Sequence, residues 1–255
     1  MRVSFVIGGT QKGGTSALAS FLRQHPQICM PADRKELHFF DREEEFDGKP
    51  DYRGYHNSFR PEKKQTVIGE ATPIYMYWNP APARIWTYNP AMKWIVILRD
   101  PAERAFSAWN METQRDRENL SFEEAIEKEA ARCREALPLQ HRIYSYADRG
   151  FYAAQLRRLF NIFGREQCLV LLNEDLRNQH QKTLRDVFKF LEVDDSFVPE
   201  AAEVFHHEAD KTPPAPTIDK LRQMFYGDVK EVERLLQRDL TKWHPGKAQQ
   251  NQQQL

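Results

Sequence analysis

Four short apolar runs recur along the chain, at residues 3–7, 66–69, 93–98 and 168–172. Each run has the length of one strand and is rich in the branched side chains that strands favour. Segments with apolar residues at helical spacing separate the runs. Because consecutive parallel strands need a helical crossover between them, this alternation predicts a mostly parallel central sheet flanked by helices on both faces.

The clearest helix signals follow the third run. Asp100 is a good N-cap, Pro101 suits the first helical position, and Glu103 can complete a capping box. Ser121 opens a second capping box, which predicts a helix as far as about Glu135.

Further helices are predicted from the spacing of apolar residues at 150–164 and 179–191, together with two helices within 217–240. Residues 206–216 are rich in proline and should form a loop. We expect a single domain over 1–245 and a polar, disordered tail over 246–255.

A glycine-rich turn lies between the first apolar run and a predicted helix that Thr15 or Ser16 opens, with the apolar side chains of residues 17, 18, 21 and 22 on one face. Residues 9–16 read G-T-Q-K-G-G-T-S, close to the G-x-x-x-x-G-K-[ST] loop of nucleotide triphosphatases. Thr15 stands where that pattern requires lysine, and the only lysine, Lys12, lies inside the loop. Amides at such a helix start favour an anion such as phosphate. Together with the predicted parallel sheet, this loop predicts the fold class α/β, a P-loop-type three-layer fold.

Composition narrows the classes of partner. Lysine plus arginine and aspartate plus glutamate both count 37, so no net charge points to nucleic acid or a membrane surface. The three cysteines are scattered, without the spacing of a disulfide framework or a zinc site. No apolar run reaches transmembrane length and no leader is apparent, which predicts a cytoplasmic protein. A segment upstream of Met1 and the oligomeric state are left open.

Other candidate site residues lie near the predicted carboxyl edge of the sheet, where open α/β sheets bind ligands. Arg99 directly follows the run at 93–98, and Ser107 lies on the helix after it. Glu36 and His38 stand in an alternation of ionisable and apolar residues. A carboxylate or imidazole placed there could take a proton from an attacking hydroxyl or amine.

Each of these residues also has an ordinary structural interpretation. Glu36 could pair with a neighbouring cation, His38 could be a hydrogen-bonded core residue, and Arg99 could bridge to Asp100 or Glu103. Ser107 could simply pack its helix. The aromatic residues within 74–90 suit either core packing or the wall of a substrate cleft.

Six segments together resemble one family, the sulfotransferases that use 3′-phosphoadenosine-5′-phosphosulfate (PAPS), in the branch of the heparan sulfate sulfotransferases and their bacterial relatives. They are IGGTQKGGTSAL (7–18), HPQI (25–28), KELHFFD (35–41), GEATPIY (69–75), RIWTYNPAMKWIVILRDPAERAFSAW (84–109) and GFYAAQLRRLF (150–160).

The resemblance implies a role for each candidate residue. Lys12 would contact the bridge to the sulfuryl group, Arg99 and Ser107 would hold the 3′-phosphate, and Glu36 would be the catalytic base with His38 beside it. Lys211 would close over the donor. The loop around the 5′-phosphosulfate would comprise Gln11, Lys12, Gly13, Gly14, Thr15 and Ser16. PAPS would be the co-substrate and 3′,5′-adenosine bisphosphate (PAP) the product, with no metal.

One position departs from the family pattern. Many heparan-type relatives have lysine in an E-K-T-P segment, whereas this chain has Ala71 in that place. More of the charge stabilisation then depends on Lys12, and the departure argues against a heparan-like acceptor. Two alternatives to sulfuryl transfer stay open on the residues alone: a P-loop kinase or nucleotide triphosphatase, and a nucleotide-binding module without catalysis.

Overall fold

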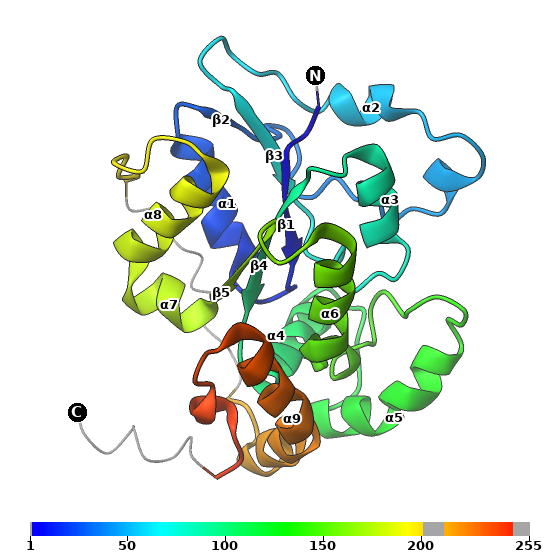
Figure 1. Cartoon of the computed structure of the whole chain (residues 1–255). Coiled ribbons are helices and arrows are strands. Elements are labelled where there is room, and N and C mark those ends of the chain that lie inside the picture. The colour runs from blue at the N-terminus through cyan, green and yellow to red at the C-terminus, as the bar shows by residue number, and fades with distance from the viewer. Residues whose placement is uncertain (1, 201–211, 247–255) are drawn as a thin grey trace. The chain divides into compact units, whose positions relative to one another are not determined.

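The computed structural model describes residues 2–200 and 212–246 (Figure 1). The described residues form two compact units. The first draws on Met1–Leu98 and Arg158–His206, and the second on Arg99–Arg157 and His207–Leu255. A single domain over 1–245 stays a prediction, and residues 247–255 of the predicted tail lie outside the described residues.

The first unit is built on a five-stranded parallel sheet in the order β2-β3-β1-β4-β5. Its strands are β1 (Phe5–Gly9), β2 (Ile28–Cys29), β3 (Val67–Ala71), β4 (Lys93–Leu98) and β5 (Cys168–Leu172). The parallel sheet flanked by helices confirms the predicted fold class. The four apolar runs correspond to β1, β3, β4 and β5. Strand β2 was not predicted, because its two residues are too few for a periodic signal.

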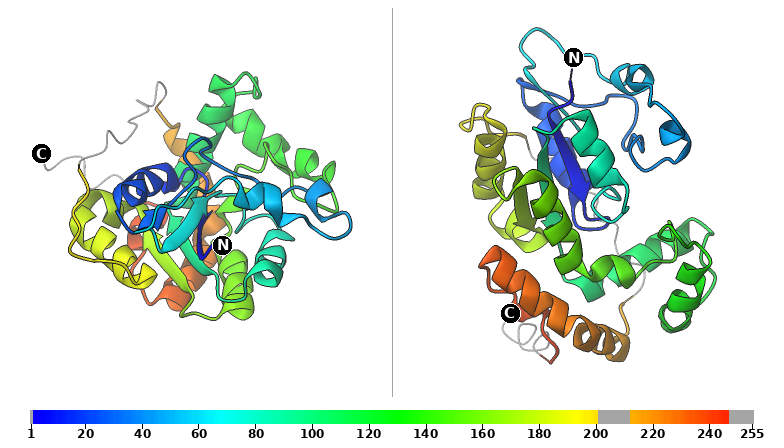
Figure 2. Two further views of the ribbon diagram at one scale, coloured as in Figure 1. Left: turned by 90° about the horizontal axis from the view of Figure 1, so that it is seen from above. Right: turned by 45° about the vertical axis from the view of Figure 1, so that its right-hand side comes forward.

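Helices cover both faces of this sheet (Figures 1 and 2). On one face lie α1 (Thr15–Gln24), α7 (Asn173–Asn178) and α8 (His180–Leu191), and on the other lies α3 (Ala81–Tyr88). Alternation along β4 explains the two faces. Ile95 and Ile97 join the core cluster with α1 and α8, whereas the Trp94 ring lies 5.4 Å from that of Phe163.

Two short helices lie within residues 41–65. These are η1 (Glu44–Phe46) and α2 (Tyr52–His56). Their rings join an aromatic cluster, in which Phe39 stacks on Tyr55 at 4.9 Å and Phe40 packs edge-on against the same Tyr55 ring at 5.2 Å. This cluster encloses the segment that follows Glu36.

The second unit is mainly helical, and one helix runs across its boundary with the first. Its elements are α4 (Pro101–Gln114), α5 (Phe122–Arg134), η2 (Asp148–Gly150), α6 (Tyr152–Phe163, continuing past Arg157 into the first unit), α9 (Ala215–Leu236) and η3 (Thr241–Trp243). The predicted N-caps are confirmed, since Asp100 accepts from the Ala102 amide and Ser121 forms a capping box with Glu124.

The helix predicted over 179–191 is confirmed by α8, and the separate helix α7 before it was not predicted. Two predicted features of the helices are wrong. Residues 217–240 contain one helix, α9, which already begins inside the predicted loop, and η3 follows only at Thr241. Glu103 does not complete a capping box. Its carboxylate lies 3.1 Å from Arg99, because a guanidinium one turn away offers a stronger partner than a backbone amide.

No helix among the residues that the structure describes is long and apolar enough to cross a membrane.

Candidate active site

The glycine-rich loop after β1 is held from beneath by backbone and hydroxyl contacts. The Ile97 carbonyl oxygen accepts from the Thr10 amide at 3.0 Å and from the Thr10 hydroxyl at 2.8 Å. The Gly13 amide in turn donates to the Thr10 carbonyl at 2.9 Å. Lys12 has φ 66° and Gly14 has φ 109°, so the loop turns through left-handed conformations at both positions.

The start of α1 offers amide donors without a capping side chain. Its N-cap is Gly14, which has none, and its first turn contains no acidic residue. The first amides of a helix lack partners within the helix and carry the positive end of its dipole. With Lys12 two residues before the N-cap, this donor set fits a phosphate-like anion.

Asn173 supports the loop from another strand. Its Nδ2 donates to the Gly13 carbonyl oxygen at 2.8 Å. Asn173 is the first residue after β5, at the same carboxyl edge of the sheet as the loop. This contact was not predicted from the sequence. The available signal was a polar side chain directly after a buried strand.

Glu36 and His38, which the family resemblance places beside each other, form one cluster with Asp41. His38 Nε2 lies 3.0 Å from Glu36 Oε2, and His38 Nδ1 lies 3.1 Å from Asp41 Oδ2. The side chains of His38 and Glu36 are 37% and 30% exposed, whereas that of Asp41 is fully buried. Each ring nitrogen of His38 thus contacts one carboxylate oxygen, and of the two carboxylates only that of Glu36 is accessible to solvent.

The two carboxylates change the charge state of His38. Hydrogen bonds to Asp41 and then Glu36 raise the pKa of His38 to about 9, against the opposing effect of burial. The imidazole is therefore protonated at neutral pH. Asp41 was not singled out in the sequence, although its place three residues after His38 in KELHFFD was a possible signal.

The cluster and the glycine-rich loop belong to neighbouring strands of the sheet. The Thr72 hydroxyl accepts the Leu37 amide at 3.1 Å, which ties the Glu36 segment to the end of β3. Ala71, just before Thr72, pairs with Ile7 of β1. The Met76 amide also donates to the Gly8 carbonyl oxygen at 2.8 Å. The two groups predicted to share a sheet edge therefore do so.

Arg99 and Ser107 belong to the second unit. The Arg99 guanidinium lies 3.1 Å from Glu103, one helical turn away, and Ser107 is half-buried on α4. Glu103 also lies 3.6 Å from Arg222, whose main partner is Asp100 at 2.7 Å. The salt bridge from Arg99 to Glu103 agrees with the ordinary structural interpretation of Arg99 that the sequence allowed. The meeting of Arg99 and Ser107 with the loop stays a prediction, and Lys211 lies outside the described residues.

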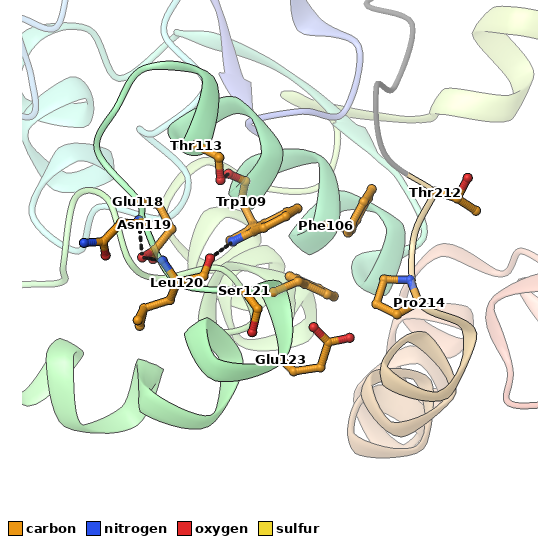
Figure 3. A pocket seen from close by; sticks show the side chains of 11 residues that line it. Phe106, Trp109, Thr113, Glu118, Asn119, Leu120, Ser121, Glu123, Thr212 and Pro214 are labelled. Atoms are coloured by element: carbon orange, nitrogen blue, oxygen red, sulfur yellow. Dashed lines mark hydrogen bonds between the residues drawn. The ribbon is translucent and has the colours of Figure 1, made fainter.

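A hollow of about 640 Å³ lies beside α4 in the second unit (Figure 3). Aromatic side chains of α4 and α5 line it, together with the turn between them and Pro214. The rings of Phe106, Trp109 and Phe122 are all buried, and the Trp109 Nε1 donates to the Leu120 carbonyl at 3.0 Å. These rings pack α4 against α5 more than they offer an open stacking face.

The aromatic residues of 74–90 mostly follow their ordinary interpretation. Tyr75, Trp78 and Tyr88 are buried in the packed interior of the first unit. Trp86 is the exception, with 46% of its surface exposed. Core packing therefore explains most of this stretch.

Comparison with known proteins identifies one family. The model of the sulfotransferase domain matches residues 3–246. Mouse heparan sulfate glucosamine 3-O-sulfotransferase 3B1 is 33% identical over 193 residues, which cover 73% of this chain and 45% of the mouse protein. The chain spans about half or less of the length of the curated relatives it matches.

Two solved structures extend the comparison. A sulfotransferase from Alicyclobacillus acidocaldarius is 32% identical with a TM-score of 0.82, covering 95% of this chain and 99% of that one. Mouse sulfotransferase SULT7A1 complexed with PAP is 11% identical with a TM-score of 0.52, covering 93% and 89%. The second likeness concerns the fold alone.

Proposed function

Because the chain belongs to the PAPS-dependent sulfotransferase family, we propose that it moves a sulfuryl group from PAPS to a hydroxyl or amine of an acceptor. The observation that carries the proposal is the uncapped start of α1 behind Lys12, at the same sheet edge as the Glu36–His38–Asp41 cluster. Group transfer from a phosphosulfate requires hydrogen-bond donors that bind the anion and, beside them, a group that accepts a proton.

The donor would be held at two points. Gln11 and Lys12, with the loop residues Gly13 and Gly14 and the helix-start residues Thr15 and Ser16, would cradle the 5′-phosphosulfate. Arg99 and Ser107 would hold the 3′-phosphate, and Lys211 would close over it. The exchangeable partner of Arg99 supports this role, because Glu103 is 44% exposed and an incoming phosphate can replace it.

Glu36 would act as the general base and Lys12 as the group that stabilises the leaving phosphate. The acceptor oxygen or nitrogen bonds to sulfur, its proton passes to Glu36, and the bond between sulfur and the bridging oxygen breaks to leave PAP. His38 already carries a proton at neutral pH and would hold Glu36 in place. The proposal involves no metal ion, so turnover should persist in the presence of EDTA.

A carbohydrate hydroxyl is the first acceptor class to test. The relatives named as 3-O-sulfotransferases act on heparan sulfate glucosamine by their names, and we extend only the chemical class to this chain. Ala71 belongs to the hydrophobic core at the end of β3, where the resemblance expects a lysine. With one cation fewer at this edge, a less anionic sugar than heparan sulfate is the better candidate.

Thermal shift and turnover together test the proposal. PAP should raise the melting temperature more than ATP with magnesium does. Stabilisation by ATP with magnesium alone would instead favour a kinase or nucleotide triphosphatase. Transfer from radiolabelled PAPS to a panel of neutral and anionic sugars, phenols and amines then identifies the acceptor. Stabilisation by PAP without transfer to any of them would favour a binding module without catalysis.

A further inference from the structure

Two hydroxyl groups hold the chain segment between Glu36 and Asp41. Thr72 Oγ1 accepts the amides of Leu37 at 3.1 Å and His38 at 3.4 Å. The Tyr75 hydroxyl accepts the amides of Phe39 at 3.1 Å and Phe40 at 3.4 Å. Four consecutive amides are thus bound by two side chains from the end of β3 and the turn after it.

These contacts matter because no helix or strand fixes the backbone of this segment. Residues 36–39 lie outside any helix or strand, and His38 has φ 54°, a left-handed conformation that a non-glycine residue adopts at a cost. The orientation of Glu36 and His38 therefore depends on the side chains that bind the adjoining backbone.

Both hydroxyl groups donate to one carboxylate. Thr72 Oγ1 donates to Glu70 Oε2 at 2.6 Å, and the Tyr75 hydroxyl donates to Glu70 Oε1 at 3.0 Å. A hydroxyl has one proton and two lone pairs. Since two amides occupy the lone pairs of each hydroxyl, its proton needs an acceptor, and Glu70 supplies one oxygen to each.

We propose that Glu70 is a positioning residue, which sets the geometry of Glu36 and His38 through the hydroxyl groups of Thr72 and Tyr75. Glu70 is fully buried on β3, so it acts through these two groups and not on the acceptor itself. Burial raises the pKa of Glu70 to about 7, opposed by the hydrogen bonds from Thr72, Tyr75 and Tyr55. The inference rests on the proposed function, because it assumes that Glu36 and His38 act at the reacting group.

Glu70→Gln tests directly whether Glu70 positions Glu36 and His38 through these two hydroxyl groups. Glutamine keeps the shape but replaces one oxygen by an NH₂ group, which cannot accept a hydroxyl proton. One pair of amides then loses its fixed partner. We expect kcat to fall about 10–100-fold, the scale of a small displacement of reacting groups, while the dissociation constant for PAP changes less than about twofold.

Single-hydroxyl variants provide a matched control and protect the test if Glu70→Gln fails to fold. Tyr55 also donates to Glu70 Oε1, at the same 3.0 Å as Tyr75, but the Phe39 and Phe40 amides bind to Tyr75. Tyr75→Phe and Thr72→Val should therefore lower kcat about tenfold, whereas Tyr55→Phe keeps it within about twofold.

The His38 ring gives a readout that needs no substrate. In Glu70→Gln, Tyr75→Phe and Thr72→Val, its titration followed by NMR should move down from about 9 toward 6.5, because the segment no longer holds it against both carboxylates. An unchanged titration with unchanged kcat would overturn the inference, as would equal losses in Tyr55→Phe and Tyr75→Phe. Shifted titrations in a protein that transfers no sulfuryl group would uphold the positioning role of Glu70 and reject the proposed function.

Discussion

The Nε2 atom of His38 lies 3.0 Å from Oε2 of Glu36, so the two side chains that could compete as base are hydrogen-bonded partners. Asp41 binds the other ring nitrogen, and the pKa of His38 is raised to about 9. An imidazole that holds both protons at neutral pH cannot accept a third. This relationship supports the proposal that the Glu36 carboxylate accepts the proton and that the ring orients it.

Replacing Glu36 should separate these roles. Glu36→Gln keeps the shape and removes the proton acceptor, and general-base help is typically worth about 10²–10⁴ in rate. We expect kcat at saturating PAPS to fall within that range, with PAP binding retained. The comparison is His38→Asn, whose amide can still donate to Asp41. If His38→Asn loses activity together with the acidic limb of the pH profile and Glu36→Gln does not, His38 is the base.

The charge on His38 predicts a pH dependence of stability. Because the pKa is raised from 6.5 to about 9 on folding, the cluster stabilises the protein fully below about pH 6.5 and loses that contribution as pH rises through 9. Asp41→Asn removes the largest cause of the shift. We expect the His38 titration measured by NMR to move toward 6.5, and the melting temperature to depend less on pH between 6.5 and 9. A titration left near 9 would show that Glu36 alone holds the proton.

Arg99→Ala should weaken PAP binding through the 3′-phosphate. The loss of a charge-assisted contact costs about 1.5–3 kcal/mol, about 10- to 150-fold in the dissociation constant. Adenosine 5′-phosphosulfate lacks that phosphate, so its affinity should change little by calorimetry. Arg115→Ala is the control, since Arg115 pairs with Glu112 at the far end of α4. Equal losses for both nucleotides would mean that Arg99 acts through its helix and not on the phosphate.

Lys12→Ala should lower turnover more than binding. Negative charge on the bridging oxygen grows only as its bond to sulfur breaks, so a lysine aimed there acts mostly in the transition state. We expect a drop in kcat of about 10²–10³ with a much smaller change in PAP affinity, measured against the exposed Lys63→Ala. Normal kcat with a raised KM for PAPS would contradict this role.

The sheet was predictable because each long strand has its own apolar run, and the residues after each run mark the binding edge. Lys12 and Glu36 could be singled out as candidates because glycines and an ionisable residue among apolar ones leave local signals. The division into two units left no such signal, because no polar or glycine-rich linker stands at Leu98 or Arg157.

The partners of the site residues were harder to predict. Asn173 and Glu70 reach the loop or the Glu36 segment only through the pairing of strands, which a single sequence does not encode by spacing. The Arg99–Glu103 bridge was foreseeable as a pair four residues apart on a helix, but the sequence could not decide between it and a capping box.

The hydrogen bond from Asn173 affects the direction in which the amides of the glycine-rich loop point. In a trans peptide the carbonyl and the next amide point in opposite directions. By drawing the Gly13 carbonyl toward itself, Asn173 turns the Gly14 amide dipole the other way, without touching any ligand. The orientation of the loop's amides therefore depends partly on a residue 160 positions further along the chain. Transplanting the glycine-rich segment alone into another parallel sheet would transfer its sequence but not its direction.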